Sequence, residues 1–181
     1  MSEPRVIVLL ISPLEDSFAV GGEISPEAMK SYRTLADKGM KVLFVTRLPL
    51  DKAADVIAPL DPLAPVLNQE QGLLMPEGSN FALFEKEQTS PKLEVSTIVG
   101  KLKSADDILI PIGIGRLPDH EFLNNVELAA LLPGSQHPQG TVSVYQCNSD
   151  GPAGWSEWAE TMMRRISIIL NKSQMRQWNG T

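Results

Sequence analysis

Cysteine and histidine are both scarce in this chain. Its 181 residues include one cysteine, Cys147, and two histidines. A single cysteine excludes a disulfide within the chain and is compatible with a reducing compartment. These three residues are also too few for a zinc site of the Cys/His type. We therefore expect a cytoplasmic protein that folds without a disulfide or a structural zinc ion.

Long hydrophobic runs and basic clusters are missing as well. The first apolar run, 6–11, has no small-residue cleavage site after it, and no run approaches the length of a membrane span. The net charge is −6, and lysine and arginine form no cluster that could follow a phosphate backbone. The sequence thus predicts no signal peptide, no membrane partner and no nucleic-acid partner.

The chain does contain a regular alternation of apolar runs and helix signals. The apolar runs are typical of strands buried on both faces of a parallel sheet. Strands are predicted at 5–11, 40–45, 65–68, 72–75, 107–113, 128–131 and 141–145, and helices at 26–38, 50–58, 91–103, 118–124 and 154–171. This alternation in a chain of 181 residues predicts one domain, 1–181, with a three-layer α/β sandwich around a mostly parallel Rossmann-like sheet.

Two of the helices have the same start signal. Ser25-Pro26 and Ser90-Pro91 each place an N-cap serine before a proline at the first helical position. The last helix carries an apolar stripe at helical spacing, which predicts the face that packs on the core. The stripe consists of Trp155, Trp158, Met162, Ile166 and Ile169.

Polar motifs follow several of the predicted strands. The first strand runs into Ser12-Pro13-Leu14-Glu15-Asp16-Ser17-Phe18. This position resembles the Asp-x-Asp-Gly-Thr motif of haloacid dehalogenase-superfamily phosphatases. Val45-Thr46-Arg47 is similar to the second motif, whose Thr or Ser binds phosphate, and Ser90-Pro91-Lys92 to the third, whose Lys steadies the phosphoryl group. The stretch 110–119 falls where the fourth motif has acidic metal ligands.

Within this superfamily the chain most resembles the mannosyl-3-phosphoglycerate phosphatase family. Gly151-Pro152-Ala153-Gly154-Trp155 is similar to the Gly-Pro-x-Gly-Trp that begins that family's last helix, and the ordered matches cover nearly the whole chain. The resemblance implies a haloacid dehalogenase-like core, a phosphate subsite at Thr46 and Lys92, and Mg²⁺ as the cofactor of any active member.

The catalytic carboxylates of that family are replaced. An alignment without gaps places Ser12 at the nucleophile and Leu14 at the general acid, while Asp119 alone remains from the fourth motif. Ser12 has no base near it in sequence and Leu14 cannot transfer a proton. Because carboxylates supply the charge that holds Mg²⁺, we expect no cofactor and no phosphatase turnover.

The chain is also too short for the family's cap domain. The polar segment 77–90 has room for a loop or a small hairpin in its place, which leaves the strand-end face uncapped. We expect an exposed apolar cluster on this face, formed by Leu14, Ile114 and Leu117. We therefore expect a pseudophosphatase with a binding or regulatory role, whose partner is a protein, a second copy of the chain, or a phosphate or sugar-phosphate ligand.

Other interpretations of the same residues stay open at this point. Glu15, Asp16 and Asp119 could form a relocated metal cluster, or they could be solvated loop acids. With Asp16 and Asp119 as ligands, the chain would be an active Mg²⁺-dependent phosphohydrolase. Thr46 and Lys92 could bind an anion, or they could be a loop cap and a solvated lysine.

Overall fold

The computed structural model describes residues 5–103, 105–140 and 142–179, with side chains described as far as Arg165. Its centre is an eight-stranded sheet in the order β10-β9-β8-β1-β4-β5-β6-β7, parallel from β10 to β5 and antiparallel from β5 to β7. The strands are β1 Val6–Pro13, β4 Lys41–Val45, β5 Val66–Asn68, β6 Gly72–Glu77, β7 Asn80–Glu85, β8 Ile108–Gly115, β9 Leu128–Leu131 and β10 Ser143–Gln146. A separate hairpin joins β2 Ala19–Val20 to β3 Glu23–Ile24.

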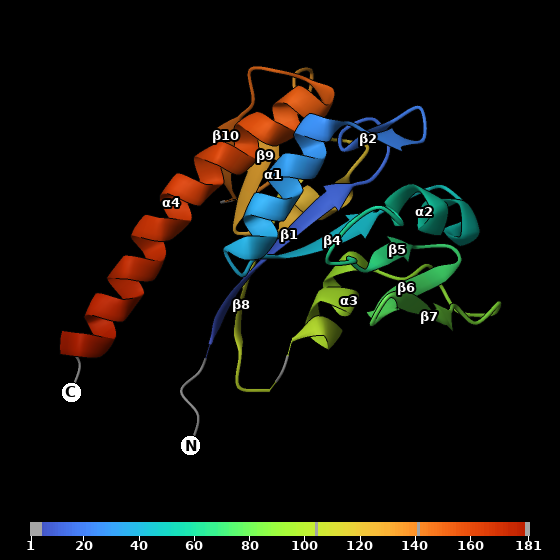
Figure 1. The fold of residues 1–181 in the computed structure, drawn as a ribbon, viewed down its shortest axis with the longest axis horizontal. Coiled ribbons are helices and arrows are strands. Elements are labelled where there is room, and N and C mark those ends of the chain that lie inside the picture. The colour runs from blue at the N-terminus through green and yellow to red at the C-terminus, as the bar shows by residue number, and fades with distance from the viewer. Residues whose placement is uncertain (1–4, 104, 141, 180–181) are drawn as a thin grey trace.

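Helices cover both faces of this sheet, which confirms the three-layer α/β architecture. The helices are α1 Pro26–Asp37, α2 Leu50–Ile57, α3 Val95–Leu102, the 3₁₀ helix η1 Glu121–Asn125, and α4 Gly151–Asn179. Residues of α1, α2 and α4 share one buried cluster with one face of the sheet, and residues of α3 and η1 share a second cluster with the other face. Figure 1 shows α1 and α4 lying side by side in front of the sheet.

The first of these helices begins where the sequence predicts. The Ser25 hydroxyl accepts a hydrogen bond from the Ala28 N–H at 3.1 Å, and Pro26 occupies the first turn. The chain turns after α1 at Gly39, whose φ of 84° is the left-handed conformation that glycine adopts without strain. These local signals fix α1 between β1 and β4, so that the ends of the two parallel strands lie next to each other.

Aromatic rings fill the core between α1, α4 and the sheet. Trp155 and Trp158 are fully buried, as is Phe18 from the loop after β1. The ring centroids of Phe18 and Trp155 are 4.8 Å apart, and those of Trp155 and Trp158 are 6.0 Å apart. This packing confirms the predicted core-facing side of the last helix as far as Met162, whereas the side chains of Ile166 and Ile169 lie outside the described residues.

The second proline signal does not start a helix. Helix α3 begins at Val95, and the Ser90 carbonyl accepts a hydrogen bond from the Lys86 ammonium at 2.8 Å. Leu93 is tied to Gln69 by two bonds, from its N–H to the Gln69 carbonyl at 2.8 Å and from the Gln69 amide to its carbonyl at 3.0 Å. The prediction of a helix from Ser90 was therefore wrong, because tertiary contacts hold this segment extended.

The strands β6 and β7 form a hairpin at one edge of the sheet (Figure 1). A Cβ atom on Gly72 would lie 2.3 Å from the Phe84 carbonyl oxygen, so only glycine allows this close pairing. β7 lies within the segment 77–90, and the protein is a small domain without a large cap. Among the described residues, no helix is both long enough and apolar enough to cross a membrane.

Candidate ligand-binding site at the strand ends

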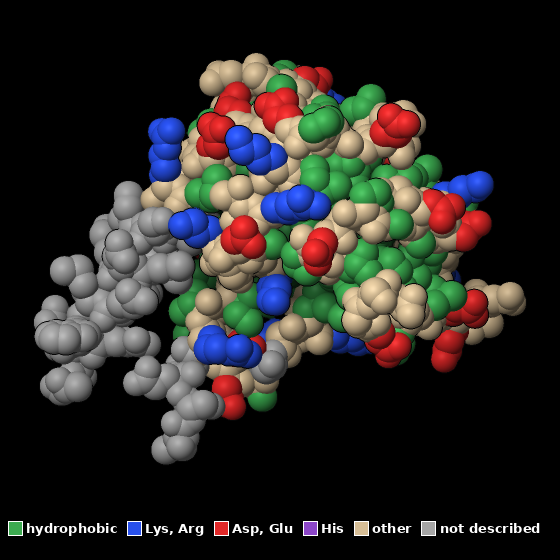
Figure 2. Space-filling view, viewed as in Figure 1, with side chains coloured by type: hydrophobic (Ala, Val, Ile, Leu, Met, Phe, Trp, Pro, Cys, Tyr) green, Lys and Arg blue, Asp and Glu red, His purple; other side chains and the backbone are tan. Residues whose placement is uncertain are grey.

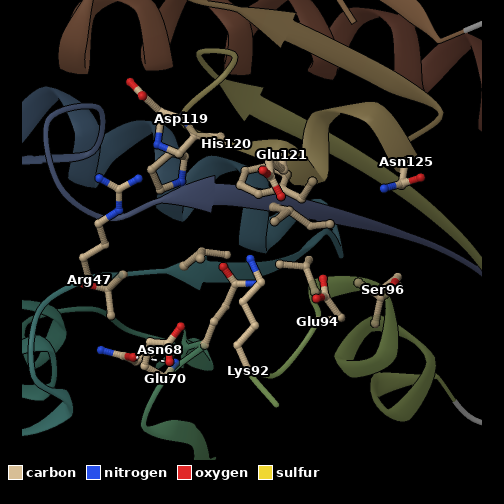
Figure 3. A pocket seen from close by; sticks show the side chains of 18 of the residues that line it. Arg47, Asn68, Glu70, Lys92, Glu94, Ser96, Asp119, His120, Glu121 and Asn125 are labelled. Carbon is tan, nitrogen blue, oxygen red and sulfur yellow. Dashed lines mark hydrogen bonds between the residues drawn. The ribbon is translucent and has the colours of Figure 1, made fainter. Parts of the chain in front are cut away.

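A cavity of about 730 Å³ opens beside the carboxyl ends of β1, β4 and β5. In parallel sheets these ends gather the loops that bind ligands. Val45 and Val95 contribute to an apolar floor, and α3 and η1 form the side walls. Figure 3 shows charged side chains around this floor, with Arg47 at one end and Glu94 at the other. Its volume is within the range of sites that bind small molecules.

Glu15 lies at the mouth of this cavity and is bound to the end of β4. Its carboxylate accepts hydrogen bonds from the Thr46 hydroxyl and, at 3.1 Å, from the Arg47 N–H. The Thr46 oxygen in turn accepts the Leu48 N–H at 3.0 Å. A hydroxyl and a backbone N–H that converge at a strand end are donors suited to an oxyanion. In this structure the chain's own carboxylate uses them.

Two basic side chains point into the cavity. Figure 3 shows Lys92 rising from the loop before α3, and Arg47 reaching from the end of β4 toward His120. Both residues are exposed, and neither forms an ion pair with another described residue. The bonds between Gln69 and Leu93 hold the loop that carries Lys92. The cavity therefore offers two unpaired cations to a ligand.

The loop after β8 brings Asp119 and His120 to the opposite wall. The His120 Nδ1 atom accepts the Arg116 N–H at 2.9 Å, and a Cβ on Gly115 would lie 2.7 Å from that nitrogen. Burial is the main reason why the pKa of His120 is lowered from 6.5. The Asp119 carboxylate acts in the opposite direction, and the positive charges of Arg47 and Arg116 lower the pKa further. His120 is thus neutral at pH 7. Asp119 is exposed and lines the cavity.

Ser12 and Leu14 point away from this cavity. Both side chains are fully buried, and neither lines the cavity wall. The Ser12 hydroxyl accepts the Trp155 indole N–H at 2.9 Å and donates to the Pro13 carbonyl at 2.8 Å. Because side chains alternate along a strand, the neighbours Pro13 and Glu15 face the cavity instead.

The expected apolar cluster at the strand ends is not on the surface. Leu14 and Ile114 have no exposed area, and Leu117 is 6% exposed. The prediction of an exposed hydrophobic face was wrong, because the core of the protein takes up these side chains. Arg116, in the same region, is paired with Asp150 and donates to the Pro133 carbonyl at 2.9 Å.

The described carboxylates of the cavity are not gathered into a metal-binding cluster. Among the described residues, no three or more His, Cys, Asp or Glu side chains are grouped so that they could hold a metal ion. The Glu15 carboxylate is engaged by Thr46 and Arg47, and Asp16 does not line the cavity. Mg²⁺ is usually held by one or two carboxylates together with water molecules. Of the two predicted ligands only Asp119 lines the cavity, and Asp16 and Asp119 as metal ligands stay a prediction.

Sequence reasoning identified Thr46, Lys92 and Asp119, and the structure brings all three to one cavity. It missed Arg47 as a binding group, although this residue directly follows Thr46 at the strand end. It also missed the bond between Glu15 and Thr46, which no local pattern reveals because the two residues are far apart in the chain.

Comparison with solved structures finds proteins of the same fold, among them a phosphatase. The chain is similar to 3-deoxy-D-manno-octulosonate 8-phosphate phosphatase from Moraxella catarrhalis, which was solved with magnesium, phosphate and KDO. The TM-score is 0.58 at 12% identity, and the match covers 86% of this chain and 85% of that one. A protein from Eubacterium rectale gives a TM-score of 0.58 at 10% identity, covering 85% of this chain and 98% of that one. A hypothetical protein from Xanthomonas campestris gives 0.53 at 12% identity, covering 91% and 87%.

No family model and no curated protein matches the chain. At these low identities the likeness to solved structures establishes the fold alone. The protein thus shares the α/β fold of these solved structures and has no large cap.

Proposed function

We propose that this protein is a pseudophosphatase related to the mannosyl-3-phosphoglycerate phosphatases, with a binding or regulatory role. The observation that carries the proposal is the side chain that β1 turns toward the cavity. That residue is Pro13. Proline has neither a nucleophilic atom nor a proton to transfer, so an aspartyl-phosphate of the kind these phosphatases form has no attachment point.

Two features of the loop after β1 support Pro13 as the counterpart of the catalytic aspartate. In Asp-x-Asp-Gly-Thr this assignment matches Glu15 to the second aspartate, Asp16 to the glycine and Ser17 to the threonine. Asp16 has a φ of 65°, the conformation for which a glycine is normally used. The Ser17 hydroxyl donates a hydrogen bond to the Pro13 carbonyl at 3.0 Å, and this bond closes the loop after β1. The motif is therefore displaced by one residue from the alignment that puts Ser12 first.

Glu15 gives a second reason for the loss of activity. Its carboxylate takes the Thr46 hydroxyl and the Arg47 N–H, which are the donors that a phosphate group would use there. A second anion beside this carboxylate would be repelled. We expect a ligand anion to be bound instead by the side chains of Arg47 and Lys92, which both line the cavity. Phosphate and sugar phosphates have the charge for this site.

The alternative function is a Mg²⁺-dependent phosphohydrolase that uses Asp16 and Asp119. It needs both carboxylates at one ion, and only Asp119 lines the cavity. The position of Asp16 therefore favours the non-catalytic function.

Phosphate release separates the two functions. We expect no release from mannosyl-3-phosphoglycerate or from an aryl phosphate, with or without Mg²⁺, above the level of the Thr46→Ala, Lys92→Ala double variant. Mg²⁺-dependent release that disappears in Asp119→Asn would overturn the proposal in favour of the alternative.

Ligand binding tests the positive half of the proposal. Inorganic phosphate and a sugar phosphate should each raise the midpoint of thermal unfolding of the wild-type protein, because a ligand of the native state stabilises it. The shift should vanish in Arg47→Ala, Lys92→Ala and grow in Glu15→Gln, which removes the competing charge. A Glu127→Gln variant is the control, since Glu127 is exposed and does not line the cavity. Equal shifts in all four proteins would contradict binding at this site.

A further inference from the structure

The sheet ends at β7 in an unprotected edge. Among the described residues, β7 pairs with β6 alone. Natural edge strands are commonly blocked by lysine, proline or a bulge. β7 contains neither lysine nor proline, and its only charged residue is Glu85 at its end. The opposite edge strand, β10, is shorter and its Tyr145 is bonded to Glu157 of α4.

Exposed apolar side chains are concentrated on this strand. Four large hydrophobic residues are strongly exposed in the described part of the chain, and two of them are consecutive in β7. Leu83 is 49% exposed and Phe84 is 59% exposed. They project to opposite faces of the sheet because side chains alternate along a strand. Figure 2 shows hydrophobic side chains at the surface on the side of the molecule where β5, β6 and β7 lie.

The hydrogen-bonding pattern of β7 leaves the backbone N–H and C=O groups of every second residue without a partner in β6. Pro76 of β6 faces Phe81 and has no N–H to give. By the alternation of an antiparallel ladder, the backbone groups of Phe81, Leu83 and Glu85 then point outward. A hydrogen bond just after β7 is consistent with this alternation. The Lys86 N–H points inward and donates to the Gln71 carbonyl, in the turn between β5 and β6, at 2.8 Å.

We propose that β7 pairs with β7 of a second copy of this chain, antiparallel and with Leu83 opposite Leu83 of the other copy. In this register the two Leu83 residues exchange their free N–H and C=O groups. Phe84 lies opposite Ala82 of the other copy, so a large exposed ring meets a small side chain on the second face. The pairing continues the sheet across the two-fold axis and covers both exposed residues. A two-fold axis requires such a self-complementary surface.

This dimer involves a different surface from the proposed ligand site, because no residue of β7 lines the cavity. A single pair of six-residue strands makes an interface below the standard size of stable complexes. The association should therefore depend on protein concentration, with exchange between monomer and dimer.

Sedimentation of the full chain tests the proposal. We expect the wild-type mass to rise from that of a monomer toward twice that value as the concentration goes from low to high micromolar. Leu83→Glu places two like charges opposite each other at the axis and should remain monomeric. The matched control is Ile108→Glu, because Ile108 is 51% exposed and lies on β8, away from the proposed interface. This variant should dimerise like the wild type. A wild-type protein that stays monomeric, or a Leu83→Glu protein that dimerises, overturns the proposal.

Cross-linking tests the register. Cα atoms that face each other across an antiparallel pair are about 5.5 Å apart, a distance that a disulfide can bridge. Leu83→Cys should form a disulfide-linked dimer under mild oxidation, and Val20→Cys, at a site 53% exposed elsewhere, should not. The native Cys147 is 2% exposed and does not compete. Cross-linking by Ala82→Cys without cross-linking by Leu83→Cys would overturn the register.

Discussion

Substituting aspartate at Ser12 and at Pro13 tests which residue of β1 faces the cavity. An aspartate at position 12 would lie in the core beside Trp155, where the wild-type side chain is fully buried. Burial keeps such a carboxyl group protonated in the folded state, whereas it ionises near pH 3.9 in the unfolded chain. At position 13 the carboxylate reaches the open cavity instead.

The expected difference in stability follows from this protonation. Keeping the carboxyl group neutral at pH 7 costs about 1.36 × (7 − 3.9), or roughly 4 kcal/mol of unfolding free energy. That is a large part of the roughly 5–15 kcal/mol typical of a folded domain. The Pro13→Asp variant should lose less, because position 13, although buried, lies on the wall of the cavity, where water can hydrate the carboxylate. The lost restriction of the unfolded chain by proline accounts for about 1 kcal/mol of its loss.

Urea unfolding at two pH values measures both quantities. The penalty for Ser12→Asp should be about 2.7 kcal/mol smaller at pH 5 than at pH 7, because the unfolded state gains less from ionisation there. The control Ser12→Asn adds similar volume without a charge, and its penalty should not change with pH. Equal losses for Ser12→Asp and Pro13→Asp would refute the orientation of β1 on which the proposed function depends.

Three further predictions concern single residues elsewhere in the fold. Gly72→Ala should destabilise the protein by about 2 kcal/mol or more in urea unfolding, because its Cβ would collide with the Phe84 carbonyl; a loss below about 0.5 kcal/mol would contradict this close pairing. The lowered pKa of His120 means that the unfolded chain binds a proton more readily, so wild-type stability should fall as the pH drops below about 6.5. In His120→Gln that fall should be smaller, and an identical pH profile would refute the role of burial. Burial raises the pKa of the Cys147 thiol to about 12, so iodoacetamide at pH 8 should modify it only after unfolding in guanidinium, as measured by mass spectrometry. Rapid modification of the native protein would show that the thiol is accessible.

The orientation of β1 shows why the site was harder to predict than the fold. Apolar runs and helix signals depend on local composition, so the β1 and α1 segments could be located within a residue or two. A shift of one residue in a strand, however, moves every side chain to the opposite face. The alignment without gaps puts Ser12 at the nucleophile position, whereas the residue of β1 that lines the cavity is its neighbour Pro13, which we propose as the counterpart instead.

Distant contacts decided the other features that the sequence could not specify. Ser25-Pro26 and Ser90-Pro91 carry the same local signal, yet only Ser25 begins a helix, because the segment after Ser90 is bound to Gln69. Leu14 is apolar in any environment, but only its neighbours in the folded chain determine that it is buried.

The sequence by itself therefore determined the α/β fold, the order of its main strands and helices, and the lack of a large cap. These features follow from periodicity, helix caps and the short length of the segment 77–90. The tertiary structure alone decided that Glu15 occupies the donors of Thr46 and Arg47, and that β7 presents Leu83 at an open edge. These properties arise from residues brought together across the sheet, and no local pattern contains the distance between them.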